Sequence, residues 1–309
     1  MGSEAMSFGR AVLIVNPRAG GGRVAREMPE VERELLARRI DHRIVETEGP
    51  GHAVALTREA LEAGERFVVA VGGDGTVHEV VNGMLPEGRP LAHDAVLGVV
   101  AAGSGSDFVK TFGLPGDSVR AVRHLAGDRT YQIDAVRVSY RDGDGQGHRC
   151  FVNIGEAGLG AAVVRRAARL PRRMRGGRYF VGFWIELARY RPGEIRLRAD
   201  RKEWTGRAVN VIVANCQFFG NGMRISPRSY PGDGLLDVQI NHGPKSEAFT
   251  LLPKIYRGEH VPHPHIKELR GAVVEVEGDR PLALEADGES LGTTPARFEI
   301  LPQVLTLKI

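Results

Sequence analysis

The stretch VVAVGGDGTVHEVVNG, residues 68–83, decides the fold of the first half of the chain. Its apolar run is typical of a strand that is buried on both faces of a parallel sheet. A helix is expected next, because Thr76 suits an N-cap and Glu79 stands three residues on, as in a capping box. A strand, a glycine turn and a helix N-terminus together place backbone N–H groups where an anion can approach.

Asp74 is the unusual residue of this stretch, because it stands among Gly72, Gly73 and Gly75. A negative charge does not suit a phosphate cradle unless it meets a metal ion or a substrate hydroxyl. The position therefore favours a phosphate site with a metal or an acceptor nearby. As an exposed loop carboxylate, Asp74 is expected to contribute little to folding.

Length and composition exclude several classes of protein. A chain of 309 residues favours two domains, and 42% hydrophobic and 26% charged residues are ordinary for a soluble globular protein. No apolar run approaches the ~20 residues of a membrane span, and no signal peptide is evident. The two cysteines, Cys150 and Cys216, do not support a disulfide framework or a cysteine-based zinc site. A cytoplasmic protein is the simplest expectation.

The first part of the chain alternates strand and helix. Strands are predicted at 11–17, 41–49 and 67–73, with helices at 21–39 and 52–64 between them. The apolar stripe of the first helix comprises Met28, Val31, Leu35 and Leu36. This alternation predicts a doubly wound parallel sheet, with ligands at the carboxyl ends of its strands. We expect a nucleotide-binding α/β domain over residues 8–130.

Three glycine-rich turns would lie together on that edge of the sheet. They are NPRAGGG (16–22), GGDGT (72–76) and AGSGSD (102–107). Each alone is a weak signal, and none is a P-loop or a GxGxxG fingerprint. Three such turns on one edge favour a phosphate-binding site.

From about Tyr131 the pattern changes to short strands, interrupted by predicted helices near 158–170, 178–190 and 245–257. We expect a β-rich, sandwich-like second domain over 131–300, with residues 301–309 packing back on the first domain. Within it, RCFVNIGEAG (149–158) is predicted as one strand. The histidine-rich segment GEHVPHPHIK (258–267) is interpreted as a loop whose prolines break any regular metal-ligand geometry.

Acidic residues cluster at two places in the second half. Asp233 and Asp237 flank a glycine turn, and from spacing alone a plain turn is favoured. LEADGESLG holds Glu285, Asp287 and Glu289, which could share one strand face or straddle a turn at Asp287-Gly288. Three acids so close repel each other unless a cation lies among them or one of them holds a proton.

A basic segment, residues 165–178, carries many arginines and is followed by Tyr179, Phe180 and Trp184. It is either a solvated helix face or a contact with an anionic membrane surface. No nucleic-acid motif accompanies it, so nucleic acid is not expected as a partner.

In combination, these motifs resemble the diacylglycerol kinase catalytic-domain family, which includes bacterial soluble lipid kinases and the sphingosine and ceramide kinases. GGDGT followed by HEVVNG carries the likeness first. NPRAG is similar to the family's Asn-Pro-x-Ser-Gly loop, and ETEGPGHA to its Thr-x-x-x-Gly-His-Ala stretch. LGVVAAGSGSDFVKTFGLP, GDGLLDV and DGE follow in the family's order, so the likeness covers nearly the whole chain.

The resemblance implies an ATP- and Mg²⁺-dependent lipid kinase, most simply of diacylglycerol, with its active site in a cleft between the domains. The implied ATP site comprises Asn16, Thr47, Gly72, Gly73, Asp74, Gly75, Thr76, His78, Glu79, Gly103 and Ser104. Asp74 would act at the phosphates, directly or through Mg²⁺. Asp233, with the backbone carbonyls of Tyr230 and Leu235, would match a structural Mg²⁺ site of the bacterial members.

Asp287 and Glu289 would occupy the catalytic base position, and the sequence does not choose between them. Ala19, His78 and Ser106 depart from the family's usual Ser, Asn and Asn. They keep open a catalytically inactive nucleotide- or lipid-binding regulatory protein. An NAD kinase-like phosphotransferase is the other alternative, against which GDGLLDV and DGE argue. The expected partner is a lipid presented at a membrane surface by peripheral contact; a homodimer is left open.

Overall fold

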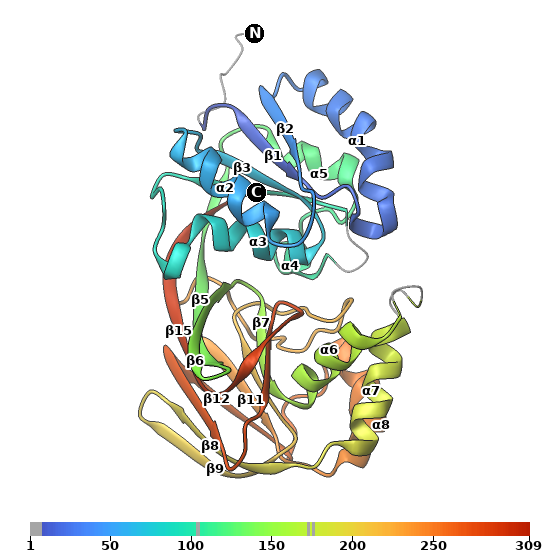
Figure 1. Ribbon diagram of the computed structural model, residues 1–309, viewed down its shortest axis with the longest axis vertical. Coiled ribbons are helices and arrows are strands. Elements are labelled where there is room, and N and C mark those ends of the chain that lie inside the picture. Colours follow the sequence, from blue (N-terminus) through green and yellow to red (C-terminus); the bar gives the residue numbers. More distant parts are fainter. Residues whose placement is uncertain (1–7, 103–105, 172–173, 175–176) are drawn as a thin grey trace. The chain divides into compact units, whose positions relative to one another are not determined.

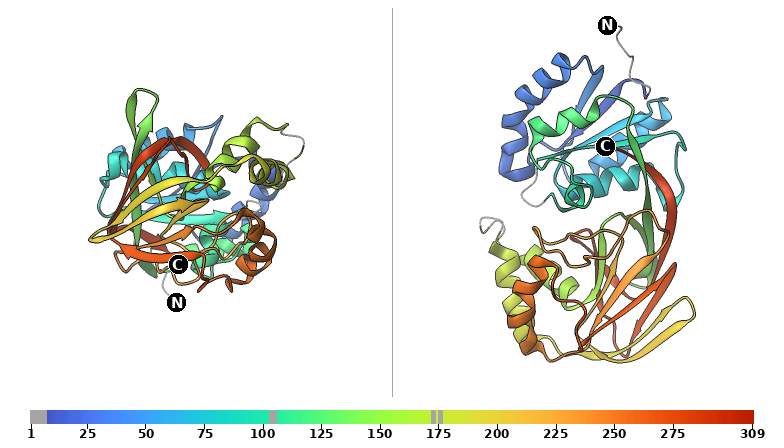
Figure 2. Two further views of the ribbon diagram at one scale, coloured as in Figure 1. Left: turned by 90° about the horizontal axis from the view of Figure 1, so that it is seen from below. Right: turned by 180° about the vertical axis from the view of Figure 1, so that it is seen from behind.

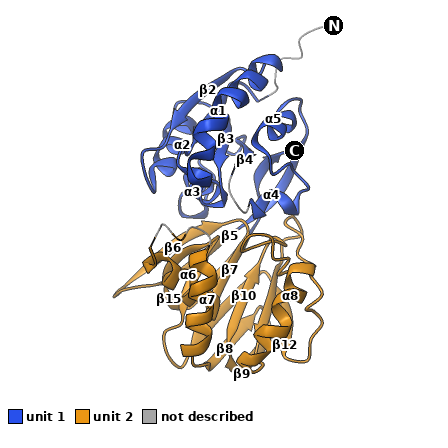
Figure 3. Cartoon of the chain, turned by 90° about the vertical axis from the view of Figure 1, so that its right-hand side faces the viewer, with its two compact units in different colours: residues 1–135, 301–309 blue, residues 136–300 orange. Residues whose placement is uncertain are grey.

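The computed structural model describes residues 8–102, 106–171, 174 and 177–309 (Figure 1). The chain forms two compact units (Figure 3). Unit 1 comprises residues 1–135 and 301–309, and unit 2 comprises residues 136–300. Two long strands, β5 (Thr130–Asp142) and β15 (Glu289–Lys308), each contribute residues to both units.

Unit 1 is a parallel α/β unit. Its elements are β1 (Ala11–Val15), α1 (Ala19–Ala37), β2 (His42–Glu46), α2 (His52–Glu62), β3 (Phe67–Gly72), α3 (Asp74–Met84), η1 (Pro86–Gly88), β4 (Val96–Ala101), α4 (Asp107–Thr111) and α5 (Ser118–Leu125). The strand order is β15-β4-β3-β1-β2, and the neighbouring pairs are parallel. Because β2 and β3 lie on opposite sides of β1, the strand order reverses between β1 and β3. Ligands of doubly wound sheets bind at such a switch point.

Helices cover both faces of this sheet (Figures 1 and 2). On one face, α1 and α5 pack against β1, β3 and β4, and Val31, Leu35 and Leu125 are almost completely buried there. On the other face lie α2 and α3. Leu36 is 65% exposed, so its placement in the buried stripe of the first helix is wrong. It falls one residue beyond Leu35, which turns it about 100° away from the core.

The predicted capping box at Thr76 and Glu79 is also wrong. α3 begins earlier, with Gly73 as its N-cap, and the Thr76 N–H already donates to the Gly73 carbonyl at 2.9 Å. The Glu79 carboxylate instead accepts from the backbone N–H groups of Gly51 at 2.9 Å and Ala53 at 3.1 Å. Glu79 therefore caps the neighbouring helix α2, where a negative charge is favourable.

Unit 2 is an antiparallel β unit flanked by helices. Besides its share of β5 and β15, it contains β6 (Gly145–Phe151), β7 (Ile154–Gly158), α6 (Leu159–Arg169), α7 (Gly177–Arg189), β8 (Gly193–Ala199), β9 (Lys202–Ala208), β10 (Asn210–Ala214), β11 (Leu236–Asn241), η3 (Lys245–Glu247), α8 (Ala248–Arg257), β12 (Ile266–Gly271), β13 (Val273–Gly278) and β14 (Ala283–Ala286). The order β12-β11-β10-β7-β14-β15 forms its main path. β8 is paired on one side with β9 and on the other with β13, which pairs β15. Alternate strand residues form its core.

The predicted fold class is confirmed: a parallel α/β unit is followed by a β-sandwich-like unit. The single strand expected at 149–158 is wrong, since β6 ends at Phe151 and β7 begins at Ile154. The break occurs because the backbone N–H groups of Val152, Asn153 and Ile154 turn toward one side chain, described below. No helix among the described residues has the length and apolarity to span a bilayer.

Candidate functional site

The first set of candidate residues lies at the carboxyl edge of the unit 1 sheet. Asn16 follows β1 directly, and its side-chain amide donates to Thr76 Oγ1 at 3.3 Å, across the switch point between β1 and β3. Its backbone N–H donates to the Val71 carbonyl at 3.0 Å. Thr47 follows β2, and its N–H donates to the Val15 carbonyl at 2.8 Å. These bonds hold the first two glycine turns and the end of β2 along one edge.

The first and third glycine turns also approach each other closely. Residues 20–22 have φ values of 60°, 68° and 81°, so the regular part of α1 starts only after Gly22. A Cβ at Gly20 would lie 2.8 Å from the Ala102 carbonyl oxygen, a contact that real side chains do not make. Glycine is therefore required there for both conformation and space. The same holds for Gly72, where a Cβ would lie 2.3 Å from Thr76 Oγ1.

Asp74 connects the second turn to the segment after the third. Its carboxylate accepts from the backbone N–H groups of Asp107 at 3.2 Å and Phe108 at 3.1 Å, at the start of α4. Asp74 is half-buried in this position. The expectation that Asp74 is an exposed loop carboxylate is therefore wrong, because it is the half-buried first residue of α3 and bonds the backbone of α4. The sequence could not reveal it, because the partners are 33 and 34 residues away.

The remaining predicted ATP-site residues are placed as follows. His78 is only 4% exposed, and its carbonyl accepts from the Asn82 amide at 2.8 Å, so the side chain is not presented at the surface. The Glu79 carboxylate accepts backbone hydrogen bonds at the start of α2. Gly103 and Ser104 lie outside the described residues.

In unit 2, the Asp-Gly-Glu segment forms the turn of a hairpin between β14 and β15. Ala286 pairs with Glu289, which leaves Asp287 and Gly288 as a two-residue turn with φ values of 50° and 84°. Positive φ at both residues is typical of a type I′ turn. Of the two alternatives for these acids, the turn is therefore the correct one. Glu289 is exposed to solvent, whereas Asp287 is buried, with 9% of its surface exposed.

The Asp287 carboxylate accepts three backbone hydrogen bonds. Oδ1 accepts from Asn153 at 3.0 Å and Ile154 at 3.1 Å, and Oδ2 accepts from Val152 at 3.2 Å. The Asp287 N–H in turn donates to the Ile154 carbonyl at 2.9 Å. These bonds explain the break between β6 and β7 and hold the carboxylate in one orientation.

A buried pair of carboxyl groups, Glu156 and Glu285, lies behind this turn. The two residues face each other across β7 and β14 and are 4% and 0% exposed. Glu285 Oε2 accepts from the Gly288 N–H at 2.8 Å, and Asn210 donates to Glu156 Oε1 at 3.1 Å. Burial raises the pKa of Glu156 to about 7, and burial together with the charge of Glu156 raises the pKa of Glu285 well above its usual range.

Glu285 is thus the acid of the 285–289 cluster whose raised pKa favours the protonated form. Glu156 was missed by sequence reasoning. The available signal was a carboxylate inside the apolar run FVNIGEAGLG, a position that is seldom charged unless it is paired.

We expect the pair to make the protein less stable as pH rises. The folded state of Glu156 binds a proton that the unfolded chain releases near pH 4.5, so its contribution is complete below that pH and is lost toward about pH 7. A shift of this size corresponds to about 3 kcal/mol. Glu156→Gln, which is neutral at every pH, should reduce the loss between pH 5 and pH 8 by the part that Glu156 contributes, while buried Glu285 keeps its own part. Urea unfolding of both proteins at the two pH values measures it; equal losses would contradict it.

An arginine lies beside the carboxylates of the predicted structural Mg²⁺ site. Arg270 of β12 forms ion pairs with the Asp233 carboxylate and, through Nε at 3.0 Å, with Asp237. The other Asp233 oxygen accepts from the Leu235 N–H at 3.0 Å, and the Tyr230 carbonyl accepts from the Gly232 N–H at 2.8 Å. Arg270 thus supplies the positive charge that an ion would bring. In this arrangement Asp233 pairs with Arg270, and the assignment of Tyr230, Asp233 and Leu235 as Mg²⁺ ligands stays a prediction.

Comparisons with known proteins agree with this architecture. Residues 10–138 match the model of the diacylglycerol kinase catalytic domain, and residues 153–309 match that of the YegS C-terminal NAD kinase beta sandwich-like domain. The class is therefore a two-domain chain with a kinase-type α/β domain and a sandwich-like C-terminal domain. The chain belongs to the diacylglycerol kinase catalytic-domain family and carries a YegS C-terminal domain.

Full-length relatives support the same grouping. The chain is 26% identical to a "Probable lipid kinase YegS-like" of Klebsiella pneumoniae, covering 98% of this chain and 97% of that one. It is 28% identical to a "Diacylglycerol kinase" of Mycobacterium tuberculosis, covering 96% and 94%. A crystal structure of a diacylglycerol kinase from Bacillus anthracis shares the fold, with a TM-score of 0.74, 22% identity and 98% coverage of both chains.

Proposed function

We propose that this protein is an ATP- and Mg²⁺-dependent lipid kinase that phosphorylates a hydroxyl group of a diacylglycerol-like lipid. The observation that carries the proposal is the approach of three glycine-rich segments to one another at the carboxyl edge of the unit 1 sheet. Asp74 lies among them and accepts from the backbone N–H groups of Asp107 and Phe108. The match to a kinase catalytic domain supports the use of ATP as the phosphoryl donor.

Unit 1 would bind the phosphates of ATP. Backbone N–H groups of glycine-rich turns donate to phosphate oxygens, and glycine is needed where the backbone must approach closely. Mg²⁺ accompanying ATP would neutralise phosphate charge, and Asp74 is the carboxylate that would hold it. Asn16 would keep the first turn in register with Thr76 through their hydrogen bond.

Unit 2 would supply the carboxylates of the Asp-Gly-Glu hairpin. The acceptor hydroxyl oxygen forms a bond to the γ-phosphorus while the bond from that phosphorus to the β–γ bridging oxygen breaks, and ADP leaves. The hydroxyl proton passes to a carboxylate, for which Asp287 and Glu289 are the candidates. The three backbone bonds to Asp287 support a role that requires a fixed orientation.

Incubation with γ-labelled ATP and Mg²⁺ tests the proposal. The acceptor panel is diacylglycerol, monoacylglycerol, sphingosine, ceramide and phosphatidylglycerol, with NAD as the control for an NAD kinase-like activity. Label in diacylglycerol is expected. Label in NAD alone would overturn the proposal, and no label in any acceptor would favour the inactive regulatory alternative that Ala19, His78 and Ser106 leave open.

We further propose that unit 2 reaches its lipid through an aromatic face on α7 and α8, made of Tyr179, Phe180, Trp184 and Phe249. Phe180 and Phe249 are 62% and 64% exposed, and the Trp184 ring lies 6.0 Å from Phe180 and 5.0 Å from Phe249. On the adjacent α6, Arg165 and Arg169 are exposed. Aromatic rings beside basic residues are typical of contact with an anionic bilayer surface. Residues 172–173 and 175–176 of the basic segment lie outside the described residues.

We expect Phe180→Ser with Phe249→Ser to weaken binding to phosphatidylglycerol-containing vesicles by at least tenfold, because about 25 cal/mol is lost for each Å² of apolar surface no longer buried. Wild-type binding should fall as salt rises. Vesicle co-sedimentation measures both. Leu36→Ser is the matched control, because Leu36 is 65% exposed but belongs to α1 of unit 1. Equal weakening by the control would contradict a specific face.

A further inference from the structure

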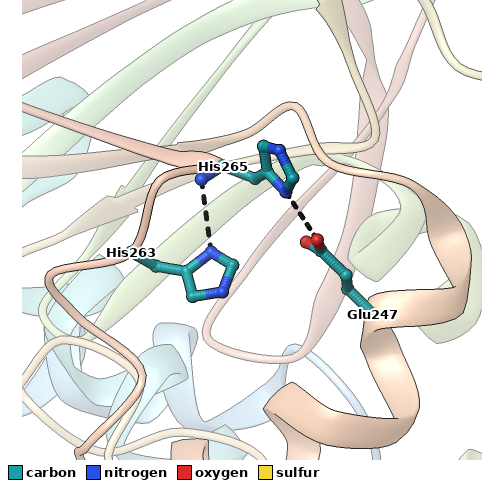
Figure 4. A group of neighbouring side chains, drawn as sticks. All are labelled: Glu247, His263 and His265. Carbon is teal, nitrogen blue, oxygen red and sulfur yellow. Dashed lines mark hydrogen bonds and ion pairs between the residues drawn. The ribbon is translucent and has the colours of Figure 1, made fainter.

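Three side chains of types that can bind a metal ion lie close together in unit 2, apart from the residues discussed so far. They are Glu247, His263 and His265 (Figure 4). Their candidate ligand atoms all lie within 4.8 Å of one another. His265 Nδ1 lies 2.5 Å from Glu247 Oε1, and the His265 N–H donates to His263 Nδ1 at 3.2 Å. All three residues are half-buried.

These residues come from two segments that are separate in sequence. Glu247 ends the short helix η3 and serves as the N-cap of α8, while the two histidines precede β12. The segment 258–267 is a loop as far as residue 265, as expected, and β12 begins at Ile266. The expectation that its prolines prevent ligand geometry is wrong. The Pro-His-Pro-His run turns so that both imidazoles lie beside Glu247 (Figure 4).

The carboxylate of Glu247 lies beside the two histidines, and one of its oxygens has no other partner among the described residues. This oxygen, Oε2, is buried. Gly243 permits this position, because a Cβ there would lie 2.3 Å from Glu247 Oε2 and 2.8 Å from His265 Cβ. A buried carboxylate oxygen without a partner is costly, and a cation would satisfy it.

We propose that Glu247, His263 and His265 form a binding site for Zn²⁺. Two imidazoles and one carboxylate are a donor set that Zn²⁺ favours, and three protein ligands leave a fourth position for water. Two donors on one tetrahedral zinc ion lie about 3.4 Å apart, so side-chain rotations that bring the ligand atoms closer close the cluster onto the ion. Mg²⁺ prefers oxygen ligands and is not expected to compete.

Binding exchanges two hydrogen bonds for coordinate bonds. The ion takes the place of the proton between His265 Nδ1 and Glu247, which is released to water, and one nitrogen of His263 turns to the ion. The site then joins the start of α8 to the loop before β12. The His265 carbonyl also accepts from the His242 N–H at 3.0 Å, so the link extends to the residue after β11. Because α8 carries Phe249, zinc would stabilise one of the two helices that form the aromatic face.

Titration of the chelator-treated, full-length protein with Zn²⁺ alone tests the site by competition with a chromogenic chelator. One Zn²⁺ per chain is expected, with affinity unaffected by millimolar Mg²⁺. Loss of an outer partner weakens metal sites by about 10–100-fold, so loss of a ligand in Glu247→Gln, His263→Gln or His265→Gln should weaken binding by about 100-fold or more. His148→Gln, at an exposed histidine of β6, should bind like the wild type.

Co²⁺ provides a second measurement that needs no variant. A wild-type protein with this site should give the intense visible absorption of four-coordinate Co²⁺, and Zn²⁺ should abolish it. Absence of saturable binding, weak six-coordinate absorption, or equal affinity in the ligand variants would overturn the proposal. The assay contains no ATP or lipid, so its outcome is independent of the kinase proposal.

Discussion

Asp74→Asn is expected to lower ATP-dependent lipid phosphorylation about 100-fold or more, because a charge that acts on the transferring phosphoryl group is lost. The same substitution should cost about 1 kcal/mol of unfolding free energy. The asparagine keeps one acceptor oxygen but turns an amide donor toward one of the two N–H groups of α4. Initial rates at saturating ATP and urea unfolding measure the two effects.

Asp117→Asn separates the two effects. Asp117 is the N-cap of α5 and accepts from the Arg120 N–H at 2.9 Å, so it is a second helix-capping aspartate of unit 1. It lies outside the three glycine-rich turns at 16–22, 72–76 and 102–107. The control should therefore keep its activity and lose no more stability than Asp74→Asn, because asparagine retains the single acceptor that an N-cap needs. If Asp74→Asn is no less active than this control, Asp74 is only a cap.

Asp287→Asn is expected to abolish lipid phosphorylation almost completely and to destabilise unit 2 by about 1–3 kcal/mol. Asparagine tolerates the positive φ of the turn, but its amide cannot accept all three backbone N–H groups that the carboxylate now satisfies. Glu289→Gln changes an exposed residue, so its stability should stay within about 0.5 kcal/mol of the wild type. Its activity should fall only in part.

The comparison of these two variants decides which carboxylate accepts the hydroxyl proton. Activity is measured at a temperature where circular dichroism shows both variants folded, and ATP binding should survive in each. A complete loss in Glu289→Gln with only a partial loss in Asp287→Asn would move the base to Glu289. Normal activity in both would remove the hairpin from the mechanism.

The parts of the fold that follow from local sequence were predictable. Apolar strands followed by glycine turns and amphipathic helices indicated a parallel sheet, and the rule for its carboxyl edge brought Asn16, Thr47 and Gly72 to one side. Helix ends were less predictable. Glu79 matches a capping box by spacing, yet its carboxylate binds the N–H groups of a different helix.

The partners of the candidate side chains could not be predicted, because they come from distant segments. Arg270 belongs to a strand that sequence reasoning missed, and it reaches Asp233 from 37 residues away. Glu156 meets Glu285 only through the pairing of β7 with β14. Spacing identified the carboxylates in each case, but only tertiary structure shows which of them are paired, protonated or engaged with the backbone.

The return of residues 301–309 to unit 1 bears on the order in which the protein folds during synthesis. On the side away from β3, β4 pairs with β15, with Thr306 opposite Val96 and Leu307 opposite Leu97. Lys308 is fully buried there, and its ammonium group donates to the Arg129 carbonyl at 2.9 Å. The ribosome must therefore complete all of unit 2 before the first sheet can close. Until then β4 is an open strand edge, which is prone to pair with other chains. A nascent chain or a fragment ending near residue 135 is expected to aggregate unless a chaperone covers that edge.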